Sequence, residues 1–239
     1  MLSNTKIKYI QTLYHKKKRD AEGVFIAEGV KIVNELLTTP AITVQEIFAT
    51  AEWAQNHAKT GFPVTEVTEK ELERISLLTT PNQALAIVRQ PVRGTLPVLT
   101  TGLSVALDGI QDPGNLGTII RTCDWFGIRH IICSEDCADV FNPKVIQATM
   151  GSFLRVTVHY TALENLLREQ QIPVYAAVLN GKPVKEKATE GILLIGNESR
   201  GISAALQPLC TEHISIERKG GAESLNAAVA CGILLAQLT

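Results

Sequence analysis

Three turns in the second half of the chain carry polar side chains of the kinds that bind ligands and move protons. The first, at 108–117, reads DGIQDPGNLG; the second, at 196–201, reads GNESRG; the third, at 223–226, reads ESLN. The first two follow apolar runs that resemble strands, and the third opens a run of small and apolar residues. Since ligands of α/β proteins bind beyond the carboxyl ends of strands, these turns predict a functional site.

Two charged side chains stand out near these turns. Arg121 lies in an otherwise apolar stretch, so its guanidinium needs a partner or access to solvent. Glu198 lies between glycines that allow a ligand to approach the backbone closely, and Arg121 is a candidate partner for its carboxylate. A structural interpretation remains open for the other turns, because Asn115 and Ser224 are both suitable N-cap residues for the helices that follow.

The last predicted helix is unusually rich in small residues. Positions 227–232 read AAVACG. Small side chains permit close approach of backbone, so this run predicts that a threaded loop, a cofactor or a second subunit packs tightly against the helix.

Several classes of protein are disfavoured by what the sequence lacks. It has no G-x-G-x-x-G, no P-loop and no G-x-S-x-G motif, and its five histidines form no close cluster. The five cysteines are scattered and odd in number, which favours a reducing cytoplasm over a disulfide framework, and no zinc-ligand set is complete. We therefore expect no metal, and the absence of a long apolar run predicts no membrane span.

The net charge of −1 conceals an asymmetry. Residues 1–19 carry six basic residues and no acid, which leaves 17 basic and 24 acidic residues elsewhere. A basic segment on an acidic body suggests a polyanionic partner, with contacts at Lys16, Lys17, Lys18 and Arg19. The alternative is a solvated helix face. Ile7, Ile10 and Tyr14 share one face at helical spacing, so this segment can dock by that side.

The order of apolar runs predicts an α/β protein in two parts. Residues 1–90 read as a small α/β unit in which Ile26, Val30, Val33 and Leu37 fit one helix, while 44–49, 63–67 and 84–88 fit strands and 51–59 and 69–75 fit helices. Residues 91–102 resemble a linker. Apolar strands alternate with helices over 103–239, which predicts a mainly parallel sheet covered on both faces.

Taken together, the three turns resemble the motifs of the SpoU (TrmH-like) branch of the SPOUT RNA methyltransferases. The matching pieces are 107–121, LIGNE at 194–198 with Gly201, ISI at 214–216 with SLN at 224–226, and TMGSFLRV at 149–156. The resemblance covers about 103–239. Residues 1–90 resemble the ribosomal-protein-like substrate-binding domain of many members, most clearly in FIAEG at 25–29. The family implies a C-terminal trefoil knot, which sequence rules alone would not suggest, and a homodimer through the knotted region.

The resemblance also implies a reaction and a set of site residues. Family members transfer a methyl group from S-adenosylmethionine to a ribose 2′-hydroxyl of RNA. Residues implied to line the cofactor are Leu179, Gly196, Ile216 and Leu225; those that match catalytic-site positions are Asn115, Arg121, Glu198, Ser224 and Asn226. Glu198 is expected to orient Arg121 or to take the proton. The third motif usually has proline where this chain has Ser215, which predicts a looser cofactor loop.

Two other kinds of function remain open from the sequence. One is a non-catalytic RNA-binding protein that retains the fold, and the other is a nucleotide- or phosphate-binding α/β enzyme that uses the Asn115 turn as an anion site. Within the methyltransferase interpretation, the N-terminal domain favours ribosomal RNA over transfer RNA as substrate.

Overall fold

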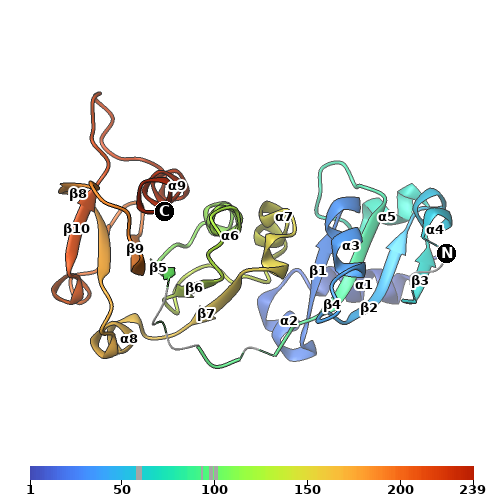
Figure 1. Cartoon of the computed structure of the whole chain (residues 1–239). Coiled ribbons are helices and arrows are strands. Elements are labelled where there is room, and N and C mark those ends of the chain that lie inside the picture. The colour runs from blue at the N-terminus through green and yellow to red at the C-terminus, as the bar shows by residue number, and fades with distance from the viewer. Residues whose placement is uncertain (58–60, 93, 97–98, 100–101) are drawn as a thin grey trace. The chain divides into compact units, whose positions relative to one another are not determined.

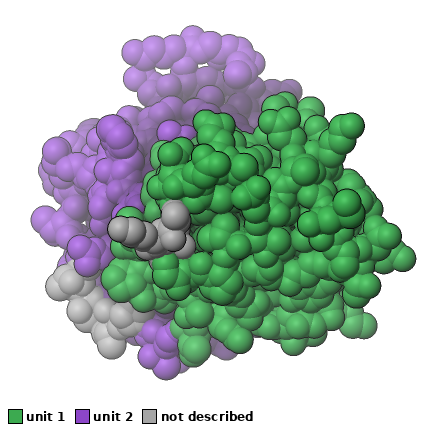
Figure 2. All heavy atoms as spheres, turned by 90° about the vertical axis from the view of Figure 1, so that its right-hand side faces the viewer, with its two compact units in different colours: residues 1–93, 141–154 green, residues 94–140, 155–239 purple. Residues whose placement is uncertain are grey.

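The computed structural model describes residues 1–57, 61–92, 94–96, 99 and 102–239. They form two compact units, coloured separately in Figure 2: unit 1 contains 1–93 and 141–154, and unit 2 contains 94–140 and 155–239. Part of the predicted linker at 91–102 (93, 97–98 and 100–101), and the end of the helix predicted at 51–59 (58–59), fall outside the described residues. The sequence predicts one continuous second domain, whereas 141–154 pack within unit 1.

Unit 1 is built on a four-stranded sheet in the order β1-β4-β2-β3, in which β4 runs antiparallel to β1 and β2, and β3 runs parallel to β2 (Figure 1). The strands are β1 (Val24–Glu28), β2 (Val44–Ala49), β3 (Val64–Glu66) and β4 (Ala84–Arg89). The helices are α1 (Asn4–Thr12), α2 (Lys16–Glu22), α3 (Val30–Leu37), α4 (Ala51–Asn56), α5 (Glu69–Ile75), α7 (Pro143–Thr149) and the 3₁₀ turn η1 (Ser152–Leu154).

The first strand corrects one prediction. The sequence pattern places Ile26 in a helix with Val30, but Ile26 lies in β1, and α3 begins only at Val30. Every residue of β1 is buried, and such a short apolar run suits a buried strand as well as a helix. Gly29, at φ +96°, then turns the chain into α3 in a conformation that favours glycine.

The basic N-terminal segment packs on unit 1 as two helices. Ile7 and Ile10 are buried in a cluster with Leu72 and Ile75 of α5, and the Tyr14 hydroxyl donates a hydrogen bond to the Ile75 carbonyl. This confirms the predicted docking face. Helix α5 begins with a capping box, in which the Glu71 amide donates to the Thr68 hydroxyl and the Thr68 amide donates to the Glu71 carboxylate.

Arg19 differs from the lysines beside it. Its side chain is buried, and Nη1 donates to the carbonyl oxygens of Leu13 at 3.1 Å and Tyr14 at 2.8 Å. A guanidinium held inside the protein in this way cannot reach an RNA phosphate, so the RNA contact predicted for Arg19 is wrong. The neighbouring lysines remain at the surface: Lys16 pairs with Asp20 at 2.7 Å, Lys18 pairs with Glu22 at 2.5 Å, and Lys17 is exposed.

The segment 141–154 completes the core of unit 1. The buried ring of Phe25 in β1 stacks on Phe141, with ring centroids 4.9 Å apart, and meets the ring of Phe153 edge-on at 5.7 Å. Aromatic pairs in these geometries stabilise a core beyond their area burial. Unit 1 is therefore assembled from two stretches of chain.

Unit 2 is a six-stranded parallel sheet in the order β10-β8-β9-β5-β6-β7, which confirms the predicted parallel α/β fold. Helices α6 and α9 pack together on one face, and α8 covers the other (Figure 1). The strands are β5 (Gly102–Asp108), β6 (His130–Cys133), β7 (Thr157–Tyr160), β8 (Val174–Pro183), β9 (Glu190–Gly196) and β10 (Glu212–Ser215). The helices are α6 (Pro113–Trp125), α8 (Leu163–Glu169), α9 (Ala227–Leu238) and the 3₁₀ turn η2 (Gln207–Leu209). The implied trefoil knot stays a prediction.

Among the described residues, no helix combines the length and the apolar character needed to cross a bilayer.

We predict that Arg19 stabilises unit 1 and does not bind RNA. Arg19→Met should lower the free energy of unfolding by about 2–4 kcal/mol, because two carbonyl groups lose a charged donor. Urea denaturation measures the change. The matched control, Lys17→Met, should stay within about 0.5 kcal/mol of the wild type. If Arg19→Met were as stable as the wild type, the structural role would be refuted.

Candidate functional site

The three polar turns meet at the carboxyl edge of the parallel sheet of unit 2. The first follows β5 and the second follows β9, and these strands are neighbours whose last residues, Asp108 and Gly196, lie opposite each other. The third turn follows β10 and leads into α9. The predicted convergence of turns that lie far apart in sequence is therefore present.

A hydrogen-bonded network joins one side chain from each turn. Asn115 donates from Nδ2 to Oε1 of Glu198 at 2.5 Å, and Asn226 donates from Nδ2 to Oδ1 of Asn115 at 2.8 Å. Oδ1 of Asn226 accepts in turn from the amides of Ala228 at 3.0 Å and Val229 at 3.3 Å, which open α9. These bonds set the orientation of both amide side chains. We call Asn115, Glu198 and Asn226 the site network.

The structural interpretation of Asn115 and Ser224 as helix caps is wrong. Asp112 is the N-cap of α6 and accepts from the Asn115 amide at 2.8 Å, with Pro113 next in the chain. Asn226 is the N-cap of α9. Carboxylate and amide oxygens are both good caps, and proline suits the first helical position. The side chain of Asn115 therefore remains available to bridge Glu198 and Asn226.

The other two predicted catalytic residues do not join the network within one chain. Arg121 and Ser224 are exposed, and neither side chain bonds to a residue that the structure describes. On a regular helix, six residues place Arg121 about 120° around α6 from Asn115. The expected pairing of Glu198 with Arg121 is thus absent, and Glu198 is bound by Asn115 instead.

Of the predicted cofactor residues, Leu179 lies within β8, Gly196 is the last residue of β9, and Ile216 directly follows β10. Strand β8 pairs with β10 up to Ala176 and again from Lys182, so 177–181 bulge out of the ladder and carry Leu179. Leu179 is 73% exposed and Leu225 is 44% exposed. Ile216 and Gly196 are half-buried. Exposed leucines at this edge fit a ligand with a flat apolar ring.

Ser215 ties the bulge to β10. Its hydroxyl donates to the carbonyl oxygen of Gly181 at 2.8 Å, and the side chain is buried. A proline at this position offers no such donor. This bond ties Ser215 to the bulge, and the looser cofactor loop predicted from the missing proline stays a prediction.

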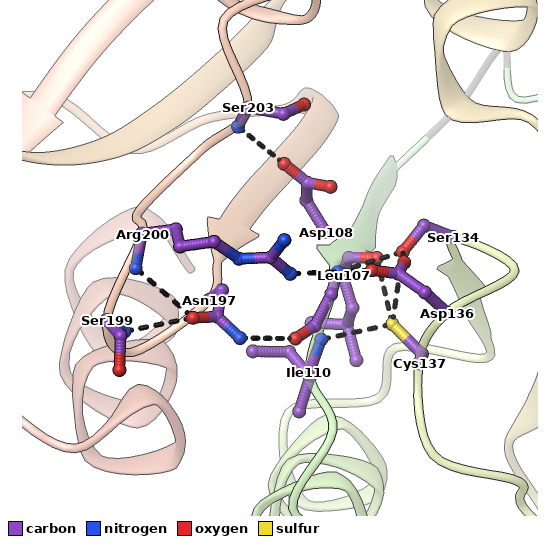
Figure 3. Close-up of polar contacts among 11 residues, drawn as sticks. Leu107, Asp108, Ile110, Ser134, Asp136, Cys137, Asn197, Ser199, Arg200 and Ser203 are labelled. Carbon is purple, nitrogen blue, oxygen red and sulfur yellow. Dashed lines mark hydrogen bonds and ion pairs between the residues drawn. The ribbon is translucent and has the colours of Figure 1, made fainter.

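A second set of contacts, not predicted from the sequence, holds the turns themselves together (Figure 3). Asn197 donates from Nδ2 to the Gly109 carbonyl at 2.7 Å, and the Ser203 amide donates to Oδ2 of Asp108 at 2.7 Å. From the turn after β6, Ser134 accepts from the Gly109 amide at 2.8 Å. The glycines around Asn197 were the available signal, but only the fold shows which turn its side chain reaches.

Cys137 lies in the same region and is almost fully buried. Hydrogen bonding from Cys133, supported by Ser134 and the amides of Ile110 and Gly109, lowers the pKa of the Cys137 thiol to about 7 although burial opposes this shift.

Within the part of the chain that the structure describes, no three His, Cys, Asp or Glu side chains gather as metal ligands would.

The fold and the site define an α/β enzyme in which polar side chains gather at the carboxyl edge of a parallel sheet. The chain also contains a second, smaller α/β unit. The model of the SpoU rRNA Methylase family matches residues 102–236, and the model of an MRM3-like substrate binding domain matches residues 4–86. The chain belongs to the SpoU rRNA methylase family.

Individual relatives are similar over the whole chain. The 23S rRNA (guanosine(2553)-2′-O)-methyltransferase RlmP of Bacillus subtilis is 31% identical and covers 98% of this chain and 96% of its own length. A structure described as a putative RNA methyltransferase of the TrmH family from Porphyromonas gingivalis has a TM-score of 0.88 at 38% identity and covers 100% of this chain and 98% of its own. An AdoMet-bound rRNA methyltransferase from Sinorhizobium meliloti has a TM-score of 0.86 at 32% identity, covering 100% and 95%.

Proposed function

We propose that this chain transfers a methyl group from S-adenosylmethionine to a ribose 2′-hydroxyl of ribosomal RNA. The observation that carries the proposal is the site network, in which Asn115, Glu198 and Asn226 meet from three separate motifs of the family. Membership of the SpoU family and relatives named as rRNA 2′-O-methyltransferases support the same reaction.

The residues proposed to hold the cofactor are Leu179, Gly196, Ile216 and Leu225. These residues lie at the carboxyl edge of the sheet. The exposed leucines suit contact with a purine ring, and the half-buried Gly196 suits contact through its backbone. When bound, S-adenosylmethionine supplies an activated methyl group. An AdoMet-bound neighbour at 32% identity supports this choice of cofactor.

The network residues have defined tasks in this reaction. The attacking 2′-hydroxyl must lose its proton, and Glu198 is the proposed acceptor, because Asn115 engages Oε1 and leaves Oε2 without a bond to any described residue. Asn115 and Asn226 hold the carboxylate in place, and Ser224 is proposed to bind the ribose. Holding the reacting groups in line supplies several kcal/mol of the acceleration.

Arg121 is proposed to bind the adjacent phosphate and to stabilise the developing alkoxide. A guanidinium cation is unsuited to act as a base but well suited to bind phosphate through two donors. Because Arg121 makes no contact with the network in a single chain, this role requires RNA, or a second copy of the chain, to bring it to the ribose.

The second copy of the chain would come from the homodimer that the family implies. We propose that this dimer forms through the region of the expected knot. Helices α6 and α9 expose large apolar side chains, with Trp125 85% exposed and Val229 49% exposed. Exposed apolar side chains on two helices that pack together are typical of an interface between subunits.

Unit 1 is proposed to bind the RNA substrate, with Lys16, Lys17 and Lys18 on phosphates. The substrate-binding-domain match and the names of the relatives favour ribosomal RNA over transfer RNA, and they favour catalysis over mere RNA binding. An RNA substrate and five cysteines that are scattered and odd in number fit a cytoplasmic location, which we also propose.

The central prediction concerns methyl transfer itself. Purified protein with labelled S-adenosylmethionine should methylate 23S rRNA at a ribose 2′-hydroxyl, located by 2′-O-methyl mapping, and should leave transfer RNA unmodified. Arg121→Ala should reduce the rate at least about 100-fold while calorimetry still detects cofactor binding. Arg168→Ala, an exposed arginine of α8, is the control. A protein that binds RNA without binding the cofactor would be the non-catalytic alternative.

A separate prediction concerns the lysines of α2. Replacing Lys16, Lys17 and Lys18 by alanine should weaken RNA binding and flatten the dependence of log K on log salt by about 0.7–0.9 for each phosphate that these lysines neutralise. Filter binding across salt concentrations measures the slope, with Arg168→Ala again as the control for removal of one charge. An unchanged slope would support the alternative, in which these lysines belong to a solvated helix face that does not contact RNA.

The last prediction of this section concerns assembly. Sedimentation velocity should give twice the mass of one chain, and Trp125→Glu should give the monomer and lose methyl transfer with it, because a charge is costly at a buried interface. Val92→Glu, at another exposed apolar residue, should stay dimeric. A monomeric, active wild-type protein would exclude the dimer.

A further inference from the structure

The geometry of the turn after β9 points to Asn197 as a positioning residue for methyl transfer. We propose that its side chain fixes the loop that carries Glu198 onto the turn that leads into α6, and so sets the distance between Glu198 and Asn115. The inference rests on the proposed function, since it assigns a role in that reaction. We call 197–201 the Glu198 loop and 108–110 the Gly109 turn (Figure 3).

The Glu198 loop is closed by backbone bonds at its base. The amide of Asn197 donates to the Gly201 carbonyl at 3.1 Å, and the amide of Gly201 donates to the Asn197 carbonyl at 2.8 Å. A Cβ on Gly196 would lie 2.3 Å from the carbonyl carbon of Gly201, so the loop closes against bare backbone. Glu198 is thereby held at the tip of a short loop that the Asn197 side chain braces from inside.

Asn197 uses both ends of its amide. Oδ1 accepts from the amides of Ser199 at 3.0 Å and Arg200 at 3.2 Å, which shapes the loop from inside. Nδ2 donates to the carbonyl of Gly109 at 2.7 Å, which joins the loop to the neighbouring turn. The position therefore requires an acceptor and a donor on one short side chain, and asparagine supplies both.

The Gly109 turn is fixed from its other side as well. Its amide donates to Ser134 at 2.8 Å, and Gly109 has φ +70°, which favours glycine. A Cβ there would come within 3.2 Å of both the Arg200 guanidinium and the Asp136 carboxylate. Because Pro113 opens α6 only four residues further on, a loop fixed to Gly109 is fixed relative to Asn115.

Asn197→Asp separates the two tasks of the side chain. The carboxylate keeps the acceptor for the loop amides but loses the donor, and it places a negative charge against the Gly109 carbonyl near Asp108. The Glu198 loop then keeps its internal hydrogen bonds but loses its hydrogen bond to the Gly109 turn. A displacement of about 1 Å at reacting groups costs about 100-fold in rate.

The test is a double-mutant cycle in single-turnover methyl transfer. Asn197→Asp should lower the rate about 10- to 100-fold, with the KM for RNA changed less than about threefold and cofactor binding retained. If Asn197 acts through Glu198, the variant with Asn197→Asp and Glu198→Gln should be no slower than Glu198→Gln alone. If the rate losses of the two single variants multiply in the double variant, the inference is overturned, because a residue that only stabilises the fold acts independently of Glu198.

Two controls keep the outcomes separate. Ser199→Ala lies in the same loop, contributes only its amide to Asn197, and should retain the wild-type rate. If the aspartate variant does not fold, Asn197→Ser repeats the cycle, since its shorter side chain keeps an acceptor and cannot reach Gly109. A wild-type protein without methyl transfer would refute the proposed function. An active wild type with an unaffected Glu198→Gln variant would refute this inference and the proton-acceptor role proposed for Glu198, and would leave methyl transfer itself standing.

Discussion

The amide of Asn115 is the interaction on which the rest of the site depends. It is bonded at one end to a carboxylate from the turn after β9 and at the other to the cap of α9, so it joins residues 83 and 111 positions away. An amide can donate and accept at once, and neither a carboxylate nor an aliphatic side chain can replace it there. The chain of bonds ends on the first amides of α9, which have no acceptor within the helix itself.

Two glycines make this arrangement possible, because they carry no side chain. Gly109 and Gly196 stand at the ends of neighbouring strands, and a Cβ at either would collide with or crowd the adjoining turn. The polar side chains that act at this edge therefore come from residues beside the glycines, and their spacing is set by backbone contacts. Precision at the site comes from closely packed turns.

The sequence was most informative where a residue type allows few alternatives. The parallel sheet followed from alternating apolar runs, and the meeting of Asn115, Glu198 and Asn226 followed from the family motifs. Arg19 was misjudged because a charge run does not show which member turns inward, and only packing against Leu13 and Tyr14 decides that. The sequence also could not show that Arg121 makes no bond to Glu198. The partner of a helix residue depends on the side of the helix from which its side chain projects, and that is known only from the fold.

The pairing of Phe25 with Phe141 and Phe153 has a consequence for how such proteins can diversify. The family match over 102–236 and the substrate-domain match over 4–86 suggest two separable modules, yet the first borrows 141–154 from within the second. A gene fusion cut near position 93 would strip the N-terminal module of two ring partners and leave Phe25 facing water. Exchange of the RNA-recognition module between relatives therefore has to carry both segments, or rebuild that aromatic packing.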